Sequence, residues 1–371
     1  MRISMNRPDT ITKNGLHFLA ADVVRLSRLL TRERDGLPAA YLKDEGLRKA
    51  YRAYFLPANL SKIHRPLRDL GLHPQNLFSR KKLRVLDIGA GPGTASLGML
   101  DFFSGQEHGP ALEFLIVDQV MENLQEAEEL FRVRRSTHSR EASMRTIHAD
   151  IAGMERTVQG HFDVVILSNV LNEVFAHDEA RTLKRVTLLQ RILEKFLADN
   201  GSCIIIEPAL RETSRELLLV RDGMLDLGLH VYSPCFGRGK CPALVNPKDW
   251  CHEDIPWGPP ALVQEIDKLI GLRKDSLKFT YLVLRKDGLS LADVCGPDAF
   301  RVVSEPLVSK GKVEFYLCRA GERKLVIRQD KDATPGNRVL TDMKRGAVVR
   351  FEKLMDEGKR FKVGKDTTVL L

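Results

Sequence analysis

The sequence predicts an α/β protein built around a seven-stranded sheet, with a helical region before it and a small basic β-rich module after it. Apolar residues recur every three or four positions from Leu16 to about Leu70, as in helices that pack on a core. From Lys81 onward, short apolar runs alternate with helical stretches, which is typical of a parallel sheet covered on both faces. After Lys286 the runs are strand-like and are separated by Gly, Pro and Asp.

These changes of pattern predict three parts: a helical region over 1–80, an α/β core over 81–288 and the basic module over 289–371. Within the core, a loop over 233–260 is rich in proline, glycine and cysteine. A chain of 371 residues is long enough for two or three domains of about 150 residues each. With 43% hydrophobic and 29% charged residues, the composition excludes collagen-like and wholly disordered chains.

The individual elements follow in chain order. Pro57 and Pro66 punctuate the first region. Its apolar stripe comprises Val23, Leu26, Leu29, Leu30, Leu47, Tyr51, Tyr54 and Phe55. The expected strands of the core are 83–88, 112–117, 144–147, 162–167, 203–206, 229–232 and 279–284. Helices are expected over 123–131, 183–198 and 211–227. The module is expected to contain strands over 312–317, 324–328 and 347–351.

The charge of the chain favours a polyanionic partner. Lys and Arg number 58 against 49 Asp and Glu, which gives a net charge of +9. From Leu307 to Leu371 there are 16 Lys and Arg and 9 Asp and Glu, so a net charge of +7 lies in the last sixth of the chain. A solvated basic surface without a partner is the alternative.

The sequence shows no sign of export or of a membrane partner. It begins without the apolar run of a secretory signal, and no stretch reaches the ~18 uninterrupted apolar residues that span a bilayer. We therefore expect a soluble, cytoplasmic protein. Its six cysteines should then be reduced, and the three that cluster point to metal ligation rather than to disulfides.

A glycine-rich turn at 85–96, VLDIGAGPGTAS, lies where a strand is expected to pass into a helix. Gly89, Gly91 and Gly93 lack Cβ atoms where the backbone must approach a ligand, and free N–H groups at the helix start can bind it. The third glycine follows the second by two residues, which departs from the dinucleotide spacing. Asp87 would repel a phosphate and would suit a cationic amino-acid ligand instead.

This turn resembles motif I of the class I S-adenosylmethionine-dependent methyltransferases, which have a Rossmann-like seven-stranded core. The resemblance implies that Asp118, after the second strand, accepts hydrogen bonds from the ribose hydroxyls. It implies that Asp150, after the third strand, contacts the adenine amino group. Ser168 and Asn169, after the fourth strand, would line the methyl-transfer pocket. A helix cap or loop role is the alternative for each aspartate alone, but three in register at strand ends favour the cofactor.

Methyl transfer itself is left open by the sequence. The Asn-Pro-Pro-Tyr element by which many amino-directed methyltransferases hold a nitrogen is absent, and 168–171 read Ser-Asn-Val-Leu instead. Asn172 and Glu173 are either polar pocket residues or, as we expect for Glu173, the opening turn of a helix that runs toward Ala180. No residue is assigned as catalytic.

A cluster of cysteines forms the second candidate site. Cys235, Cys241 and Cys251 are separated by five and nine residues in the loop SPCFGRGKCPALVNPKDWC. Three thiolates leave one position of a tetrahedral zinc or cubane iron–sulfur site to be filled. The candidates for that position are Cys295, Cys318, Cys203 and His252, of which Cys203 reads better as an inert core residue.

Basic residues lie beside these cysteines in the sequence. We expect Arg238, Lys240 and Lys248 to lower the pKa values of the thiols. The irregular spacing differs from the paired knuckles of many zinc ribbons and favours iron–sulfur over zinc.

The order of the motifs resembles the mitochondrial and bacterial small-ribosomal-subunit methyltransferase-like family. The resemblance runs over nearly the whole chain and includes LRKAYRAYFLPANLSKI, the glycine turn, SNVLNEV, the cysteine loop and VVSEPLVSKGKVEFYLC. It implies that Cys235, Cys241, Cys251 and Cys318 hold a [4Fe-4S] cluster. It also implies a role on the small ribosomal subunit or its rRNA. The stretch before Lys248 and Glu253 after the last loop cysteine depart from the family pattern.

Basic side chains of the last module are candidates for phosphate contacts of limited sequence preference. They are Lys310, Lys312, Arg319, Arg323, Lys324, Arg328, Lys344, Arg345 and Arg350. Among the aromatics Phe315, Tyr316 and Phe351, strand alternation predicts that at least half are core residues rather than base-stacking ones. The first region could extend this surface with Arg25, Arg28, Arg32 and Arg34.

We therefore expect an S-adenosylmethionine-binding, iron–sulfur protein that acts on the small ribosomal subunit or its rRNA. The first alternative is an assembly factor in which cofactor and cluster are structural and no methyl group moves. A small-molecule methyltransferase is a more distant alternative, since the basic flanks do not serve it. The sequence does not determine the oligomeric state, the target nucleotide or the redox role of the cluster.

Overall fold

The structure, a computed structural model, describes residues 12–33, 41–106, 108–137 and 141–371. The chain forms two compact units, each described by itself. Unit 1 comprises Met1–Leu67, Phe78–Arg181 and Ile255–Leu277, and unit 2 comprises Arg68–Leu77, Thr182–Asp254 and Lys278–Leu371. In the described part of the chain, no helix has the length and apolar character needed to cross a membrane.

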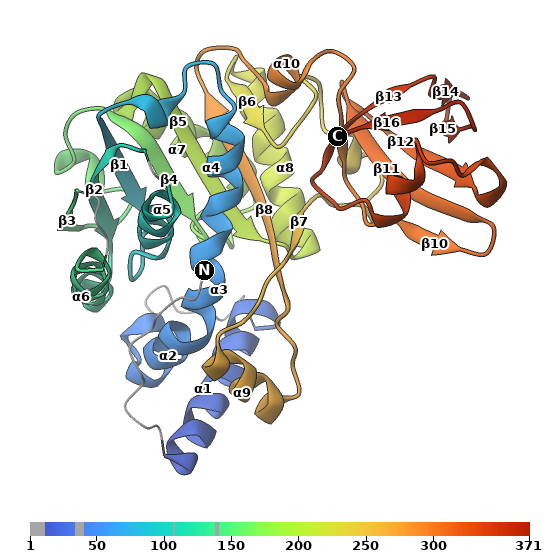
Figure 1. Cartoon of the computed structure of the whole chain (residues 1–371). Helices are drawn as coiled ribbons and strands as arrows, with labels where there is room; N and C mark the ends of the chain where they lie inside the picture. Colours follow the sequence, from blue (N-terminus) through green and yellow to red (C-terminus); the bar gives the residue numbers. More distant parts are fainter. Residues whose placement is uncertain (1–11, 34–40, 107, 138–140) are drawn as a thin grey trace. The chain divides into compact units, whose positions relative to one another are not determined.

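The first region is helical, as predicted. It contains α1 (Lys13–Thr31), α2 (Glu45–Ala50), the π-helical turn η3 (Tyr51–Phe55), α3 (Leu56–Leu60) and α4 (His64–Gly71) (Figure 1). The apolar stripe buries Val23, Leu26 and Tyr54 against Val263 and Ile266 of α9 (Ala261–Ile270). Asp44 begins α2 by accepting a hydrogen bond from the Leu47 N–H, as N-cap residues do.

Four parallel strands form the sheet of unit 1, in the order β3-β2-β1-β4. They are β1 (Lys82–Ile88), β2 (Ala111–Asp118), β3 (Ala142–His148) and β4 (Phe162–Ser168). The helices α5 (Thr94–Ser104) and α6 (Met121–Arg135) pack on this sheet (Figure 1). Because the strands are parallel, their carboxyl ends lie at one edge, where α/β proteins place their ligands.

Unit 2 contains the remaining strands of the core. After α7 (Arg181–Phe196) come β5 (Leu197–Pro208), α8 (Arg211–Asp226), β6 (His230–Ser233), the short β7 (Glu253–Pro256) and β8 (Ser276–Arg285). Within unit 2, β8 runs antiparallel to both β5 and β6, unlike the parallel strands of unit 1. The seven predicted strands are nevertheless present as β1 to β6 and β8, so the Rossmann-like α/β fold class of the class I methyltransferases is confirmed.

The last module is β-rich, as predicted. After α10 (Leu291–Cys295), its strands are β9 (Phe300–Val302), β10 (Leu307–Ser309), β11 (Lys312–Arg319), β12 (Glu322–Gln329), β13 (Val348–Glu352), β14 (Met355–Asp356), β15 (Arg360–Val363) and β16 (Thr368–Leu370). Their hydrogen-bonded order is β14-β15-β12-β11-β9-β13-β16, with β10 on β11. Strand alternation on β11 buries Val313, Phe315 and Leu317 in the module's core and leaves Tyr316 37% exposed.

Candidate cofactor and cysteine sites

The glycine turn of unit 1 joins β1 to α5 and is shaped by close packing on two sides. Gly89, Gly91 and Gly93 have φ values of 63°, 54° and 72°, which a residue with a side chain rarely adopts. A Cβ on Gly89 would lie 2.7 Å from Val170 Cγ2, and one on Gly93 would lie 3.2 Å from Ala127 Cβ. A Cβ on Gly91 would meet nothing within 4 Å, so the turn is open at its middle glycine.

Asp87 lies beneath this turn and is 0% exposed. Its Oδ2 accepts hydrogen bonds from Ser96 Oγ at 2.7 Å and from Ser96 N at 3.2 Å. Its Oδ1 is buried without a hydrogen-bond partner among the described residues. Burial raises the pKa of Asp87 to about 7, although the hydrogen bonds from Ser96 oppose this rise. A half-satisfied buried carboxyl of this kind fits a cationic group supplied from outside the chain.

Asp118, at the end of β2, holds the turn in place. Its Oδ2 accepts from Gly91 N at 2.8 Å, and its Oδ1 accepts from Val120 N at 2.8 Å and from Asn123 Nδ2 at 3.2 Å. The structure therefore brings Asp118 to the glycine turn, as predicted from its strand end. An ionised carboxylate offers about four acceptor positions, so one remains for a further donor.

Asp150, after β3, has a local role in the described structure. It is exposed, and its Oδ1 accepts a hydrogen bond from Gly153 N at 2.5 Å within its own turn. A hydrogen bond within its own turn is what the alternative role, that of a loop residue, predicts for this aspartate. Its contact with an adenine amino group stays a prediction.

The segment after β4 departs from the helix expected at Glu173. Ser168 and Asn169 are half-buried, Asn172 is 8% exposed, and Glu173 is exposed. The expected helix toward Ala180 is wrong, because 171–177 form turns and the next helix, α7, begins at Arg181. The left-handed conformations of Asn169 (φ 59°) and Phe175 (φ 58°) interrupt the helix here.

Tyr51 was missed by sequence reasoning, which treated it only as part of an apolar stripe. Its hydroxyl lies 3.2 Å from Thr94 Oγ1, at the first residue of α5, and accepts a hydrogen bond from Asn59 Nδ2 at 3.5 Å. The sequence carries no signal for this contact, because it depends on how the first helices pack on α5.

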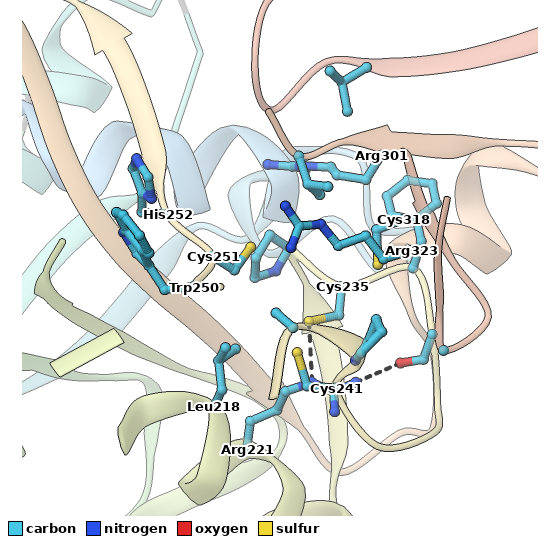
Figure 2. A pocket seen from close by; sticks show the side chains of 18 of the residues that line it. Leu218, Arg221, Cys235, Cys241, Trp250, Cys251, His252, Arg301, Cys318 and Arg323 are labelled. Atoms are coloured by element: carbon cyan, nitrogen blue, oxygen red, sulfur yellow. Dashed lines mark hydrogen bonds between the residues drawn. The ribbon is translucent and has the colours of Figure 1, made fainter. Parts of the chain in front are cut away.

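The four predicted cysteine ligands line one cavity in unit 2, with a volume of about 50 Å³. Figure 2 shows Cys235, Cys241 and Cys251 from the loop after β6 and Cys318 from β11 around this cavity. All four are free thiols. His252 also lines the cavity.

Two other cysteines had been considered as the fourth ligand. Cys203 is 0% exposed inside β5, where it pairs with Leu284 of β8, so its interpretation as a core residue is confirmed. Cys295 ends α10 and does not belong to the residues described as lining this cavity. Cys318 is therefore the candidate that the fold brings to the three loop cysteines.

The expectation that Arg238, Lys240 and Lys248 lower the thiol pKa values is wrong for Cys241 and Cys251. Burial raises the pKa of Cys241 to about 12 and the pKa of Cys251 to about 11, and it raises the pKa of Cys318 further. The neighbouring cysteines add to each rise. Two of the three expected cations are paired elsewhere: Arg238 with Asp293 at 2.8 Å and Lys240 with Asp226 at 2.5 Å. Lys248 is exposed.

Three arginines line the cavity, namely Arg221, Arg301 and Arg323. Arg221 of α8, which sequence reasoning missed, contacts one of the cysteines. It is 2% exposed, and its Nε donates a hydrogen bond to Cys235 Sγ at 3.3 Å (Figure 2). Its guanidinium also donates to the carbonyls of Gly237 and Gly239, at 2.9 Å each. Arg221 therefore fixes the cysteine loop and offers one positive charge beside a sulfur atom.

The cysteine loop is joined to the β11–β12 turn through the backbone. Ala320 N donates to Phe236 O at 2.9 Å. A Cβ on Gly237 would lie 2.4 Å from Gly321 N, so only glycine permits this approach. This contact brings Cys318 to the other cysteines without the help of a side chain.

The four thiols are the donor set from which a metal site in this cavity would be built. Among the residues that the structure describes, no three His, Cys, Asp or Glu side chains are placed to hold one metal ion. Tetrahedral zinc with Zn–S distances of about 2.3 Å requires sulfur atoms about 3.8 Å apart. An iron–sulfur cube gives each cysteine its own iron atom and so takes more widely spaced sulfurs. Four free thiols around one cavity are a donor set that either kind of group takes.

Several of the cations expected to contact phosphates are engaged within the module. Arg328 is buried and donates to Asn337 O at 3.0 Å, and Arg345 donates to Val303 O at 2.7 Å. Lys312, Arg323 and Lys324 form ion pairs with Glu314, Asp249 and Asp356 respectively. Arg319 is half-buried over a phenylalanine ring. Lys310, Lys344 and Arg350 are exposed, so the basic surface is narrower than predicted.

Some of the aromatic residues of the module are buried in its core, and one of the arginines considered in the first region is already paired. Phe315 is buried and Phe351 packs on the module's core, which confirms that at least half of the aromatics are core residues. Tyr316 is the exposed one, and Arg323 lies 4.4 Å from its ring centre. In the first region, Arg25 pairs with Asp44 at 2.9 Å. Arg28 and Arg32 are exposed, and Arg34 lies outside the described residues.

Comparison with known proteins gives one family match and several distant structures. Residues 47–351 match the family described as mitochondrial small ribosomal subunit Rsm22. No curated protein matches.

Among solved structures, an rRNA methylase from Streptococcus thermophilus is 12% identical with a TM-score of 0.29, over 60% of this chain and 93% of that one. A SAM-dependent methyltransferase from Methanosarcina mazei is 12% identical with a TM-score of 0.33, over 57% and 95%. Another from Aquifex aeolicus is 18% identical with a TM-score of 0.30, over 49% and 86%. Since these TM-scores are below 0.5, the fold is assigned from the strands of the chain itself.

Proposed function

Because the chain belongs to the Rsm22 family of the mitochondrial small ribosomal subunit, we propose that it is a methyltransferase-like protein of the small ribosomal subunit, with S-adenosylmethionine in unit 1 and a [4Fe-4S] cluster in unit 2. The observation that carries the cofactor proposal is the buried Asp87 with an unsatisfied oxygen beneath an open glycine turn. The cluster proposal is carried by four free thiols around one cavity.

The residues of unit 1 match the chemistry of S-adenosylmethionine. Asp87 Oδ1 would accept a hydrogen bond from the ammonium group of its amino-acid end. Asp118 has one acceptor position left after its three bonds to the chain, so it would bind one ribose hydroxyl rather than two. The cofactor would supply an electrophilic methyl group to an acceptor aligned with it. Asp150 remains a candidate for the adenine contact.

In unit 2, Cys235, Cys241, Cys251 and Cys318 would hold the cluster. Each would bind as a thiolate, so ligation must overcome the preference of the buried sites for neutral thiols. Arg221 would then face a thiolate with its guanidinium, which strengthens that hydrogen bond. The cluster would add its ligation energy to the backbone contact between the cysteine loop and the β11–β12 turn.

Binding to the small subunit or its rRNA is proposed from the family and from the exposed cations. Lys310, Lys344 and Arg350 would contact phosphates, and each lost contact should reduce the salt dependence of binding. The paired and buried cations of the module are assigned to its stability instead.

A second candidate, an assembly factor that transfers no methyl group, is favoured by the segment after β4. Val170 and Leu171 are 9% and 2% exposed, and Val170 packs on Gly89 of the glycine turn. Two of the four residues at the place of the missing Asn-Pro-Pro-Tyr element are thus used for packing. Ser168 and Asn169, together with Asn172 and Glu173 after them, are the polar side chains proposed to lie near a methyl acceptor.

The test is to purify the protein without oxygen, measure iron, sulfide and zinc, and incubate it with labelled S-adenosylmethionine and small-subunit particles. Label in RNA that is lost with Asp118→Asn supports the enzyme. Salt-sensitive particle binding without label supports the assembly factor. Absorbance near ~400 nm with about four irons per chain supports the cluster, whereas stoichiometric zinc contradicts it.

A further inference from the structure

Tyr51 lies at the glycine turn although it comes from the helical region that precedes the core. It occupies the first position of the π-helical turn η3, a kind of distortion that is frequent at functional sites. The turn is followed by α3, which packs on α5. Gly98 permits this packing, because a Cβ there would lie 2.1 Å from Leu60 O.

The hydroxyl of Tyr51 has a defined hydrogen-bonding arrangement. Asn59 Nδ2 donates to it at 3.5 Å, and Thr94 Oγ1 lies 3.2 Å away. A phenol has one proton and two acceptor positions. When Thr94 donates into the second of these positions, the Tyr51 proton is available to a ligand.

The surroundings of this hydroxyl point to a zwitterionic ligand. Burial is the main cause that raises the pKa of Tyr51, and the charges of Glu173 and Asp87 add to the rise, so Tyr51 stays a protonated donor. Thr94 is the first residue of the eleven-residue helix α5, whose N-terminus favours an anion. Unit 1 therefore holds two kinds of group close together. Asp87 suits an ammonium group, and the start of α5 with the Tyr51 hydroxyl suits an anion.

We propose that Tyr51, oriented by Asn59, donates a hydrogen bond to the α-carboxylate of the bound S-adenosyl ligand while Asp87 binds its ammonium group. This inference rests on the proposed cofactor site and makes Tyr51 a specificity-determining residue for the amino-acid end. The helical region before the core thereby becomes part of the cofactor site.

Two ligands separate this role from a merely structural one. S-adenosylhomocysteine carries the amino-acid end, and 5′-methylthioadenosine lacks it. Calorimetric titration of the full chain should show that Tyr51→Phe weakens binding of S-adenosylhomocysteine about tenfold or more and leaves binding of 5′-methylthioadenosine unchanged. Tyr232→Phe is the matched control, because it removes a buried hydroxyl that donates to Asp69 O at 3.0 Å in unit 2.

Each result has one meaning. Equal weakening of both ligands by Tyr51→Phe, or no weakening of either, overturns the inference and leaves the cofactor site intact. If the unaltered chain binds neither ligand, the cofactor proposal itself fails. Thermal unfolding of Tyr51→Phe, compared with that of Tyr232→Phe, shows whether the variant retains the fold.

Discussion

Replacing Asp87 by Asn should stabilise the chain and abolish its affinity for the cofactor. Burial raises the pKa of Asp87 to about 7 from 3.8, a difference of about three units. Each unit corresponds to 1.36 kcal/mol, so the ionised carboxylate opposes folding by about 4 kcal/mol above pH 7. Because the pKa of Asp87 is higher in the folded than in the unfolded chain, this loss of folding free energy is absent below about pH 4. It grows as the pH rises to about 7.

Urea unfolding of Asp87→Asn and of the unaltered chain, at pH 4.5 and at pH 8 without ligand, measures the effect. At pH 8 the variant should be more stable by a few kcal/mol, and at pH 4.5 the difference should fall to about 1 kcal/mol. The amide oxygen can still accept the hydrogen bond from Ser96 Oγ. Asp118→Asn is the contrasting control, since it weakens three hydrogen bonds, of which one comes from the glycine turn, and should destabilise the chain by about 1–3 kcal/mol. A variant that is less stable at pH 8 than the unaltered chain refutes this reasoning.

Three further predictions concern the two sites and their packing. The Kd of S-adenosylhomocysteine should be about tenfold higher at pH 6 than at pH 8, because the ammonium group is proposed to bind the Asp87 carboxylate, and burial raises the pKa of that group to about 7; a flat calorimetric profile contradicts this. Cys318→Ser should lose most of the iron measured per chain, while the control Cys295→Ser keeps it; equal iron in both excludes Cys318 as a ligand. Gly98→Ala should destabilise the chain by about 1–3 kcal/mol in urea unfolding, because its Cβ would lie 2.1 Å from Leu60 O; Gly258→Ala is its control, because a Cβ there would meet nothing within 4 Å, and equal losses would contradict a steric cause.

The strands of the core could be predicted because burial on both faces makes each strand a short, mainly apolar run in the sequence. The same logic located Asp87 and Asp118, since residues at the ends of parallel strands meet at one edge of a sheet. It does not distinguish a ligand contact from a turn, and Asp150 accepts its hydrogen bond within its own loop.

Contacts that depend on packing between distant segments could not be predicted. Arg221 reaches Cys235 from a helix 14 residues earlier in the chain, while Arg238, a near neighbour in sequence, pairs with Asp293. Nearness in sequence therefore predicted a lowered thiol pKa, whereas the pKa values of Cys241 and Cys251 are raised. Burial outweighs the charges of cations that are paired elsewhere. Tyr51 likewise reaches Thr94 only through the packing of helices.

The backbone contact at Gly237 has a consequence for the order of assembly. Phe236 O and Ala320 N join the two cysteine-bearing segments by a main-chain bond that needs no inorganic atom. The polypeptide alone can thus bring Cys318 to the three loop cysteines, and the iron of the proposed cluster would enter a site whose ligands are already together. The side chains around this contact can therefore change, whereas position 237 must remain glycine, because any Cβ there would collide with the backbone at Gly321.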